Sequence, residues 1–348
     1  MEQGAYQMKY RKILLKTGIV IVIIVVLVLT GICGNYFYGK SCLSRNVVPY
    51  PVDVENINFN GKNYRYRDGL INILCMGIDK EEQMALRNDV GNSVGQADAI
   101  FLVSIDVEKK EIRALAIPRD TMVTLQMYDD AGSYIGSGMG QITLQYAYGD
   151  GMEKSAQLMV SQVSQLLYNI PINGYAAINV RSLWSLNDAI GGVDMYMEED
   201  YTLLNPAFEK GKVVHLTAKL LENYIRERDS DMPGTAYTRI HRLKQYMLAY
   251  FAKAKIALKE DVMLPFRALK ALEKDMETDI VAGELMYLVT KVLGCSFSES
   301  NLYTLPGTQM QGTEYEEFYL EGIKAEELIV NLFYEESDGK SESGITGK

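Results

Sequence analysis

The sequence predicts an α/β domain of three layers, α/β/α with a mixed central sheet, preceded by one transmembrane helix. Three observations predict it. Strand-like and helix-like segments alternate from about residue 70, which is typical of a sheet covered by helices. Of the 348 residues, 48% are hydrophobic, enough for one large domain or two smaller ones. A long uncharged apolar stretch lies near the N-terminus.

Residues 17–38 carry no charge, and residues 18–29 are almost wholly aliphatic. At about 1.5 Å per residue, a helix of this length crosses a hydrocarbon layer of roughly 30 Å. The four basic residues before it predict that residues 1–16 are a cytoplasmic tail and that the rest lies outside the cell membrane: Lys9, Arg11, Lys12 and Lys16. A cleaved signal peptide is the alternative, but no small-residue cleavage site follows.

Residues 39–68 contain prolines, asparagines and short polar runs, and we expect a stalk or linker there. The extracellular domain is expected over residues 69–336, followed by a disordered tail over residues 337–348. A buried strand is predicted at residues 70–76, ending close to Asp79, and the polar residues after it predict a surface loop.

A hairpin is predicted next. Residues 100–105 and 112–117 are apolar strands joined by a polar turn. Pro118 has no amide hydrogen and a fixed φ, so the second strand should end there and present Arg119 at the rim of the sheet. We expect Asp120 to orient Arg119 or to cap the turn, and not to bind a metal.

The remaining pattern alternates. Helices are predicted at residues 143–170 (with a glycine break at 149–151), 183–190, 217–228 and 238–258, strands at 175–180 and 193–197, and a loop at 229–237. After residue 258 we expect further helices and a loop around Pro306.

Composition excludes several function classes. The net charge of −10 argues against general nucleic-acid binding, which needs a basic surface. The four cysteines have no disulfide-framework or zinc-site spacing. The two histidines lack a neighbouring serine or cysteine motif, so a histidine-dependent triad is not expected.

Two carboxylates and several arginines are the candidate site residues. Asp79 follows one predicted strand and Asp98 precedes the next, as an Mg²⁺ ion held mainly by substrate phosphates would require. The alternative is that they are solvated or capping groups. Two arginine pairs predict a phosphate clamp, or else surface ion pairs: Arg226 with Arg228, and Arg239 with Arg242 on one helix face. Tyr146 and Tyr148 are interpreted as cleft wall or as packing.

Several short motifs in order resemble the LytR-CpsA-Psr family, over about residues 70–258. They are residues 73–79, 98–100, 116–121, 141–149, 187–194, and 224–228 through 239–242. The N-terminal anchor is also similar. The resemblance implies an α/β/α domain outside the membrane that holds a polyprenyl (pyro)phosphate lipid in a hydrophobic cleft.

The resemblance also implies an Mg²⁺-dependent phosphotransferase. It would move a glycopolymer, such as a teichoic acid or capsule polysaccharide, from undecaprenyl pyrophosphate to peptidoglycan during cell wall assembly. Asp79 and Asp98 would bind Mg²⁺. Five arginines would bind the pyrophosphate oxygens: Arg119, Arg226, Arg228, Arg239 and Arg242. Four residues would be catalytic: Arg119, Arg226, Arg228 and Asp98.

This chain departs from the family pattern at several positions. Gln96 and Gln141 stand where the family often has arginine and lysine, Ala99 where it has threonine, and Leu243 where it has glutamine. Residues 236–238 replace an acidic residue and a glycine. Fewer cations would then stabilise the transferring phosphate, so two alternatives stay open: a non-catalytic lipid-phosphate-binding regulator or scaffold, and a polyprenyl-pyrophosphate hydrolase.

Overall fold

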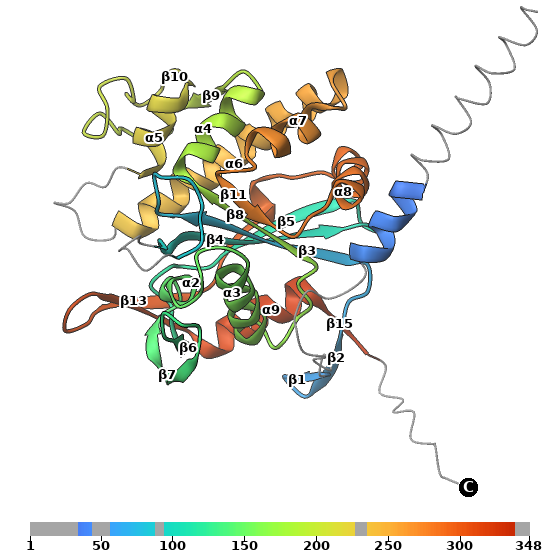
Figure 1. The fold of residues 1–348 in the computed structure, drawn as a ribbon, viewed down its shortest axis with the longest axis vertical. Coiled ribbons are helices and arrows are strands. Elements are labelled where there is room, and N and C mark those ends of the chain that lie inside the picture. Colours follow the sequence, from blue (N-terminus) through green and yellow to red (C-terminus); the bar gives the residue numbers. More distant parts are fainter. Residues whose placement is uncertain (1–33, 44–55, 88–93, 227–234, 338–348) are drawn as a thin grey trace, which may run out of the picture.

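The computed structural model describes residues 34–43, 56–87, 94–226 and 235–337, and its centre is a six-stranded sheet (Figure 1). The strand order is β11-β8-β3-β4-β5-β12. β8 pairs parallel with β3, and β12 parallel with β5, whereas the other pairs are antiparallel. The sheet is therefore mixed, as predicted. Its strands are β3 (Leu70–Ile78), β4 (Ala97–Asp106), β5 (Glu111–Ala116), β8 (Gly174–Asn179), β11 (Met276–Thr278) and β12 (Leu302–Thr304).

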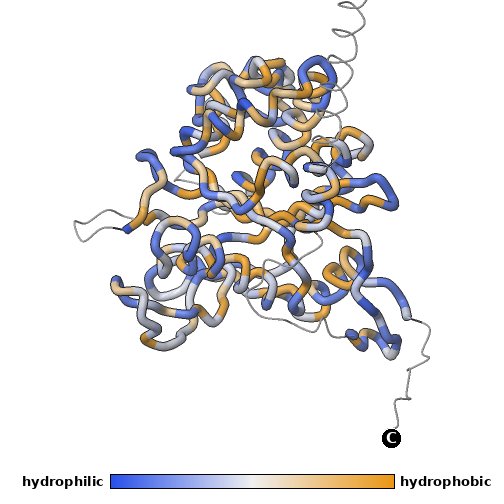
Figure 2. Tube along the Cα trace, turned by 45° about the vertical axis from the view of Figure 1, so that its right-hand side comes forward, coloured by the Kyte–Doolittle hydropathy of each residue, from blue (hydrophilic) through white to orange (hydrophobic). Residues whose placement is uncertain are grey.

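Helices cover both faces of this sheet (Figure 1). α3 (Glu153–Leu166) and α9 (Gly322–Phe333) share one hydrophobic cluster with β3 and β4. On the other face, α6 (Thr235–Glu260) and α8 (Ala282–Gly294) pack against β3, β4 and β5. Figure 2 shows hydrophobic residues along the central strands and the helices beside them. Strands buried on both sides explain why β3 and β4 read as continuous apolar runs.

A second hydrophobic cluster is built mainly from helices. Here α4 (Val180–Ala189), α5 (Ala218–Arg226), α6 and α7 (Leu264–Ala271) surround the hairpin of β9 (Val193–Tyr196) and β10 (Val213–Leu216). The short α2 (Leu144–Ala147) lies beside α3. Tyr146 is fully buried there, and its hydroxyl donates to the Gly151 carbonyl, so this ring is core packing and not cleft wall.

Two hairpins were not predicted. They are β6 (Met122–Tyr128) with β7 (Tyr134–Gln141), and β13 (Gly307–Gln311) with β14 (Glu316–Leu320). The edge strands β11 and β12 were also missed, since three residues are too few to show a strand period. The predicted loop at 229–237 is shorter at its C-terminal side, because α6 already begins at Thr235; residues 227–234 lie outside the described residues.

The boundary of the domain differs from the predicted stalk. β1 (Ile57–Phe59) and β2 (Lys62–Tyr66) form a three-stranded sheet with β15 (Tyr334–Glu336), so residues 57–66 belong to the folded unit. Arg67 strengthens this closure by donating to the Leu332 carbonyl at 2.7 Å and to Asp106 at 3.2 Å. The pairing of β2 with β15 joins residues about 270 apart in the sequence, which no local pattern predicts, whereas the hairpin of β1 with β2 turns at Asn60-Gly61, a local signal that sequence reasoning missed.

The N-terminal part is described only from residue 34. Residues 34–43 are helical, so the end of the predicted membrane span and the start of the predicted stalk form one helix. Residues 1–33, with most of the predicted span, lie outside the described residues. Among the residues that the structure describes, no helix is long and apolar enough to span a bilayer. Residues 338–348 of the predicted tail are likewise not described, whereas Ser337 donates to the Asn63 carbonyl.

One edge of the sheet contains a carboxylate that should make stability depend on pH. A carboxylate oxygen of Asp279 accepts from the Tyr175 amide at 2.7 Å, and burial raises the pKa of Asp279 to about 6. The folded state therefore binds this proton more tightly than the unfolded state, and the stabilisation present at low pH is lost as pH rises through 6.

Asp279→Asn should keep the hydrogen bond while removing the buried charge. We expect the variant to be more stable than the unsubstituted chain at pH 8 by about 1–3 kcal/mol, and the gain to disappear below about pH 4. Chemical denaturation of both proteins across this pH range measures the difference between their free energies of unfolding. A difference that does not vary with pH would contradict the assignment.

Candidate functional site

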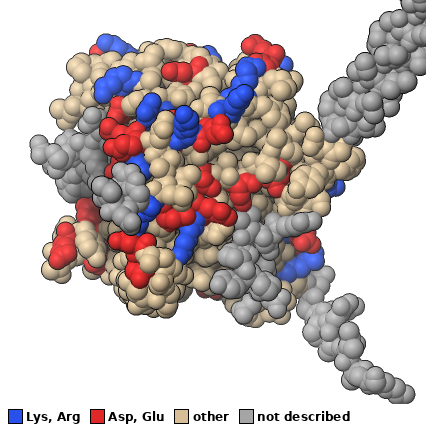
Figure 3. Space-filling view, viewed as in Figure 1, with Lys and Arg blue, Asp and Glu red and all other residues tan. Residues whose placement is uncertain are grey.

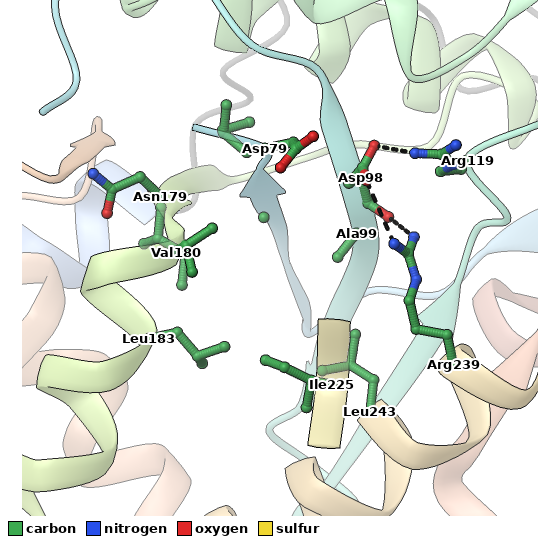
Figure 4. A pocket seen from close by; sticks show the side chains of 13 residues that line it. Asp79, Asp98, Ala99, Arg119, Asn179, Val180, Leu183, Ile225, Arg239 and Leu243 are labelled. Carbon is green, nitrogen blue, oxygen red and sulfur yellow. Dashed lines mark hydrogen bonds and ion pairs between the residues drawn. The ribbon is translucent and has the colours of Figure 1, made fainter. Parts of the chain in front are cut away.

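A cavity of about 350 Å³ lies where the ends of β3, β4 and β8 meet α4, α5 and α6 (Figure 4). Gly77 of β3 lies opposite Ala99 of β4, and a Cβ at Gly77 would lie only 3.1 Å from that of Ala99, so glycine keeps this wall open. The cavity is lined by Gly77, Ile78, Asp79, Asp98, Ala99, Arg119, Ile178, Asn179, Val180, Leu183, Ile225, Arg239 and Leu243.

Asp98 joins two arginines at the charged end of the cavity. Arg119 Nη1 donates to Asp98 Oδ1 at 2.5 Å, and Arg239 Nη1 donates to Oδ2 at 3.4 Å (Figure 4). Arg239 Nη2 also donates to the Asp98 main-chain carbonyl at 2.7 Å. The structure thus gathers Asp98, Arg119 and Arg239 from β4, the turn after β5, and α6.

The turn that carries Arg119 forms as predicted. β5 ends at Ala116, and Thr121 closes the turn by donating its amide to the Pro118 carbonyl at 3.0 Å. Asp120 lies beside Arg119, with 3.3 Å between Asp120 Oδ1 and Arg119 Nε. Gln141 in turn donates to Asp120 Oδ1 at 2.9 Å, so the carboxylate is held in place.

The charge of Arg119 is secured by its surroundings. Burial by itself would lower the pKa of Arg119, whereas the carboxylates of Asp98, Asp120 and Asp79 raise it. The balance leaves the pKa above its ordinary value. Arg119 is therefore a permanent cation in a partly buried position, where an anion would be bound more strongly than at an exposed surface.

Asp79 and Asp98 are the residues that could hold a cation here. Both line the cavity, and they come from the end of β3 and the start of β4. Mg²⁺ commonly takes one or two carboxylates and completes its coordination with waters and substrate phosphates, so this pair fits such an ion. Within the described ranges, no group of three or more acidic, histidine or cysteine side chains could hold a metal by itself.

The helix end at the cavity adds a favourable field for anions. Asn179 is the N-cap of α4, and its side chain accepts from the Ser182 amide at 2.9 Å. Asn179 and Val180 both line the cavity, so the positive end of the α4 dipole faces it. Sequence reasoning missed Asn179, although an asparagine at a strand-to-helix junction is a recognisable cap signal.

The opposite part of the cavity is apolar. Leu183 of α4, Ile225 of α5 and Leu243 of α6 point into it from three helices (Figure 4). Sequence reasoning did not identify these side chains as lining residues, because each belongs to an ordinary amphipathic helix. The cavity therefore combines a charged end with an apolar end, an arrangement that suits an amphiphile with an anionic head.

Of the three other predicted arginines, only Arg242 has a side chain among those that the structure describes. Arg242 is only 4% exposed, its guanidinium lies 5.5 Å from the Tyr201 ring centroid, and it is not among the lining residues. Positions three apart on a helix differ by about 60° in direction, which is enough to separate it from Arg239. Arg226 ends α5, but its side chain is not described, and Arg228 lies outside the described residues.

The departures from the family pattern have structural consequences. Gln141 does not line the cavity; besides Asp120 it donates to the Glu316 carbonyl at 2.8 Å and so ties β7 to β14. At position 96 it is the main-chain carbonyl of Gln96 that accepts the amides of Asp79 and Asp98, so this tie between the two strand ends does not depend on which side chain stands there. Leu243 extends the apolar wall.

Comparisons with known proteins agree with this architecture. A model described as the LytR_cpsA_psr family matches residues 44–331. The polyisoprenyl-teichoic acid–peptidoglycan teichoic acid transferase TagU of Bacillus cereus is 26% identical over 238 residues, 68% of this chain and 69% of the relative. TagU of Oceanobacillus iheyensis is 26% identical over 244 residues, 70% of this chain and 68% of the relative.

Solved structures share the fold. Bacillus subtilis TagT superimposes with a TM-score of 0.56 at 18% identity, covering 81% of this chain and 96% of TagT. A structure of TagT bound to LIIa-WTA gives a TM-score of 0.55 at 19% identity, covering 76% of this chain and 89% of that one. At these identities the likeness establishes a mixed α/β domain with a central mixed sheet.

Proposed function

The chain belongs to the LytR_cpsA_psr family, and we propose that it is a membrane-anchored phosphotransferase that moves a glycopolymer from a polyprenyl pyrophosphate carrier to peptidoglycan. The relatives named as teichoic acid transferases support the reaction class, and the relative solved with LIIa-WTA supports a lipid-linked donor. The uncharged residues 17–38 support the anchor, with the N-terminus in the cytoplasm and the domain outside.

The observation that carries this proposal is the two-ended cavity. Arg119 and Arg239 offer guanidinium groups that match phosphate oxygens, while Leu183, Ile225 and Leu243 offer an apolar wall for a hydrocarbon chain. A free sugar phosphate would use only the first set, and an uncharged lipid only the second. A polyprenyl pyrophosphate uses both.

The reaction needs positioning and charge stabilisation more than a covalent nucleophile. An acceptor hydroxyl oxygen bonds to the phosphorus that carries the glycopolymer. The bond from that phosphorus to the bridging oxygen breaks, so polyprenyl monophosphate leaves and the hydroxyl proton is released. Arg119 and Arg239 would stabilise the charge on the phosphate oxygens. Mg²⁺ bound by Asp79 and Asp98 would neutralise further charge on the pyrophosphate.

A transfer assay tests the proposal. The purified full chain is incubated with Mg²⁺ and a polyprenyl-pyrophosphate-linked glycan, with and without peptidoglycan fragments, and the products are identified by mass spectrometry. We expect a glycan–peptidoglycan phosphodiester and polyprenyl monophosphate only when the acceptor is present. Polyprenyl monophosphate without acceptor would indicate a hydrolase. Donor binding without any turnover would indicate a scaffold or regulator.

The apolar end of the cavity gives a separate prediction. Leu183→Glu should weaken binding of a polyprenyl pyrophosphate by about 10–100-fold, because a carboxylate would have to share the site with hydrocarbon. Binding of inorganic pyrophosphate, measured by isothermal titration calorimetry, should change much less. Leu203→Glu is the matched control, since Leu203 is 81% exposed and does not line the cavity. An equal loss of affinity for polyprenyl pyrophosphate and for inorganic pyrophosphate in Leu183→Glu would contradict a hydrocarbon-binding site.

A further inference from the structure

Helix 34–43 packs closely against α8. A side chain at Gly39 would overlap the main-chain oxygen of Gly283, so the two helices meet backbone to backbone. The Tyr36 and Tyr287 rings lie 5.3 Å apart, and Leu43 is 2% exposed. The place where the chain enters the domain, at residue 34, therefore has a fixed position on the side of α8.

The sequence before residue 34 indicates that the start of helix 34–43 lies next to the membrane. Residues 17–33 are uncharged and mostly aliphatic, and they directly precede the docked helix. If they cross the bilayer, the membrane surface must lie close to residue 34. Phe37 and Tyr38 are 65% and 60% exposed there, and aromatic side chains prefer the depth of the lipid headgroups.

A second apolar group lies on the other side of α8. α8 contacts both α6 and α7, and Figure 1 shows helix 34–43, α8 and α7 along one side of the domain. At the α6–α7 turn, Val262 is 62% exposed and Met263 55%, and Ile256 one turn and a half earlier is 58% exposed. Exposed apolar side chains that are neighbours in a turn mark an interaction surface more often than singly scattered ones do.

We propose that the α6–α7 turn rests on the outer surface of the lipid bilayer, with Val262 and Met263 inserted among the headgroups. The inference depends on the proposed anchor and deepens the proposed function. Exposed Lys259 and Lys270 lie beside the tip, where Arg267 pairs with Asp261 and Glu260 is also exposed, so the tip carries charges of both signs. Figure 3 shows acidic and basic side chains interspersed over this layer, so apolar insertion and not a large basic field provides the contact.

This orientation explains how a lipid reaches the cavity. The apolar lining comes from α4, α5 and α6, and α7 contacts α4 and α6. The helical layer that forms the hydrocarbon end of the cavity is then the layer nearest the bilayer. A polyprenyl chain would pass from membrane to cavity with little exposure to water, and the sheet and α9 would lie farther out.

Tryptophan quenching in vesicles tests the proposal. The chain has one tryptophan, Trp184, which sets the baseline. Full-length Val262→Trp is reconstituted into phosphatidylcholine–phosphatidylglycerol vesicles whose acyl chains carry bromine, and Ile323→Trp is the matched control. Ile323 is 75% exposed on α9, in the opposite layer. We expect roughly half of the added fluorescence to be lost at position 262, as for side chains about 5–10 Å into the interface, and none at position 323.

Three outcomes would overturn the proposal. Equal quenching at both positions, or none above the Trp184 baseline at position 262, excludes a specific contact of the turn. Release of the unsubstituted chain by alkaline carbonate removes the anchor on which the inference depends. A chain that stays in the vesicles and is active in transfer but unquenched at position 262 overturns this surface alone. Met263→Trp provides a second reporter if Val262→Trp does not fold.

Discussion

Replacing Arg119 with alanine is expected to lower the turnover number of glycopolymer transfer by about 10²–10³-fold, the cost of removing one preorganised donor from a reacting oxyanion. Arg119 is partly buried, its charge is held by Asp98, Asp120 and Asp79, and it faces the cavity. Arg119→Lys should recover only part of the rate, because an ammonium group cannot make the paired contacts of a guanidinium. The transfer assay under saturating donor measures both variants.

The control for Arg119 is an arginine without access to the cavity. Arg65 has a side chain that is 58% exposed and pairs with Glu335 on the far three-stranded sheet, so Arg65→Ala should leave turnover unchanged. Thermal unfolding of both alanine variants separates loss of catalysis from loss of fold. Full turnover by a folded Arg119→Ala chain would exclude Arg119 from the reaction.

Asp98→Asn is expected to move two measured quantities in opposite directions. Both carboxylate oxygens of Asp98 accept from guanidinium groups, so a pyrophosphate bound by the same nitrogen atoms would compete with this carboxylate for Arg119 and Arg239. The neutral asparagine side chain competes less strongly with pyrophosphate for the two guanidinium groups. The affinity for inorganic pyrophosphate without Mg²⁺ should therefore rise by about tenfold. Turnover with Mg²⁺ should fall by about 10²–10³-fold, because one proposed metal ligand is lost.

The same exchange predicts that Mg²⁺ and pyrophosphate bind cooperatively to the unsubstituted chain. The anion would release Asp98 from the arginines, and the released carboxylate would become available to the cation, so each should raise the affinity for the other. Calorimetric titrations of each in the presence of the other, corrected for the Mg²⁺–pyrophosphate complex that forms in solution, measure this coupling. Asp194→Asn is the control, since Asp194 pairs with His215 at the surface. Weaker pyrophosphate binding by Asp98→Asn without Mg²⁺ would contradict the competition.

Local patterns were enough to predict the charged end of the site. Asp79 and Asp98 border apolar strands, and Pro118 ends the strand before Arg119, so their place at a sheet edge follows from local sequence alone. Arg239 was also predicted. Arg242 shows the limit, because the same helix carries both arginines but turns one towards Tyr201 and the other towards Asp98. The catalytic and binding roles of the arginines, and the binding of a metal ion by Asp79 and Asp98, stay predictions.

The sequence by itself determined the alternation of strands and helices, the apolar N-terminal stretch and the charged residues at the sheet edge. These features depend on residue periodicity within ten or twenty positions. Only the tertiary structure decided that β2 pairs with β15, that Leu183, Ile225 and Leu243 form one apolar wall, and that Asp98 holds Arg119 and Arg239 together. Such contacts join residues far apart in the chain, and the packing of whole elements, rather than any local preference, brings them together.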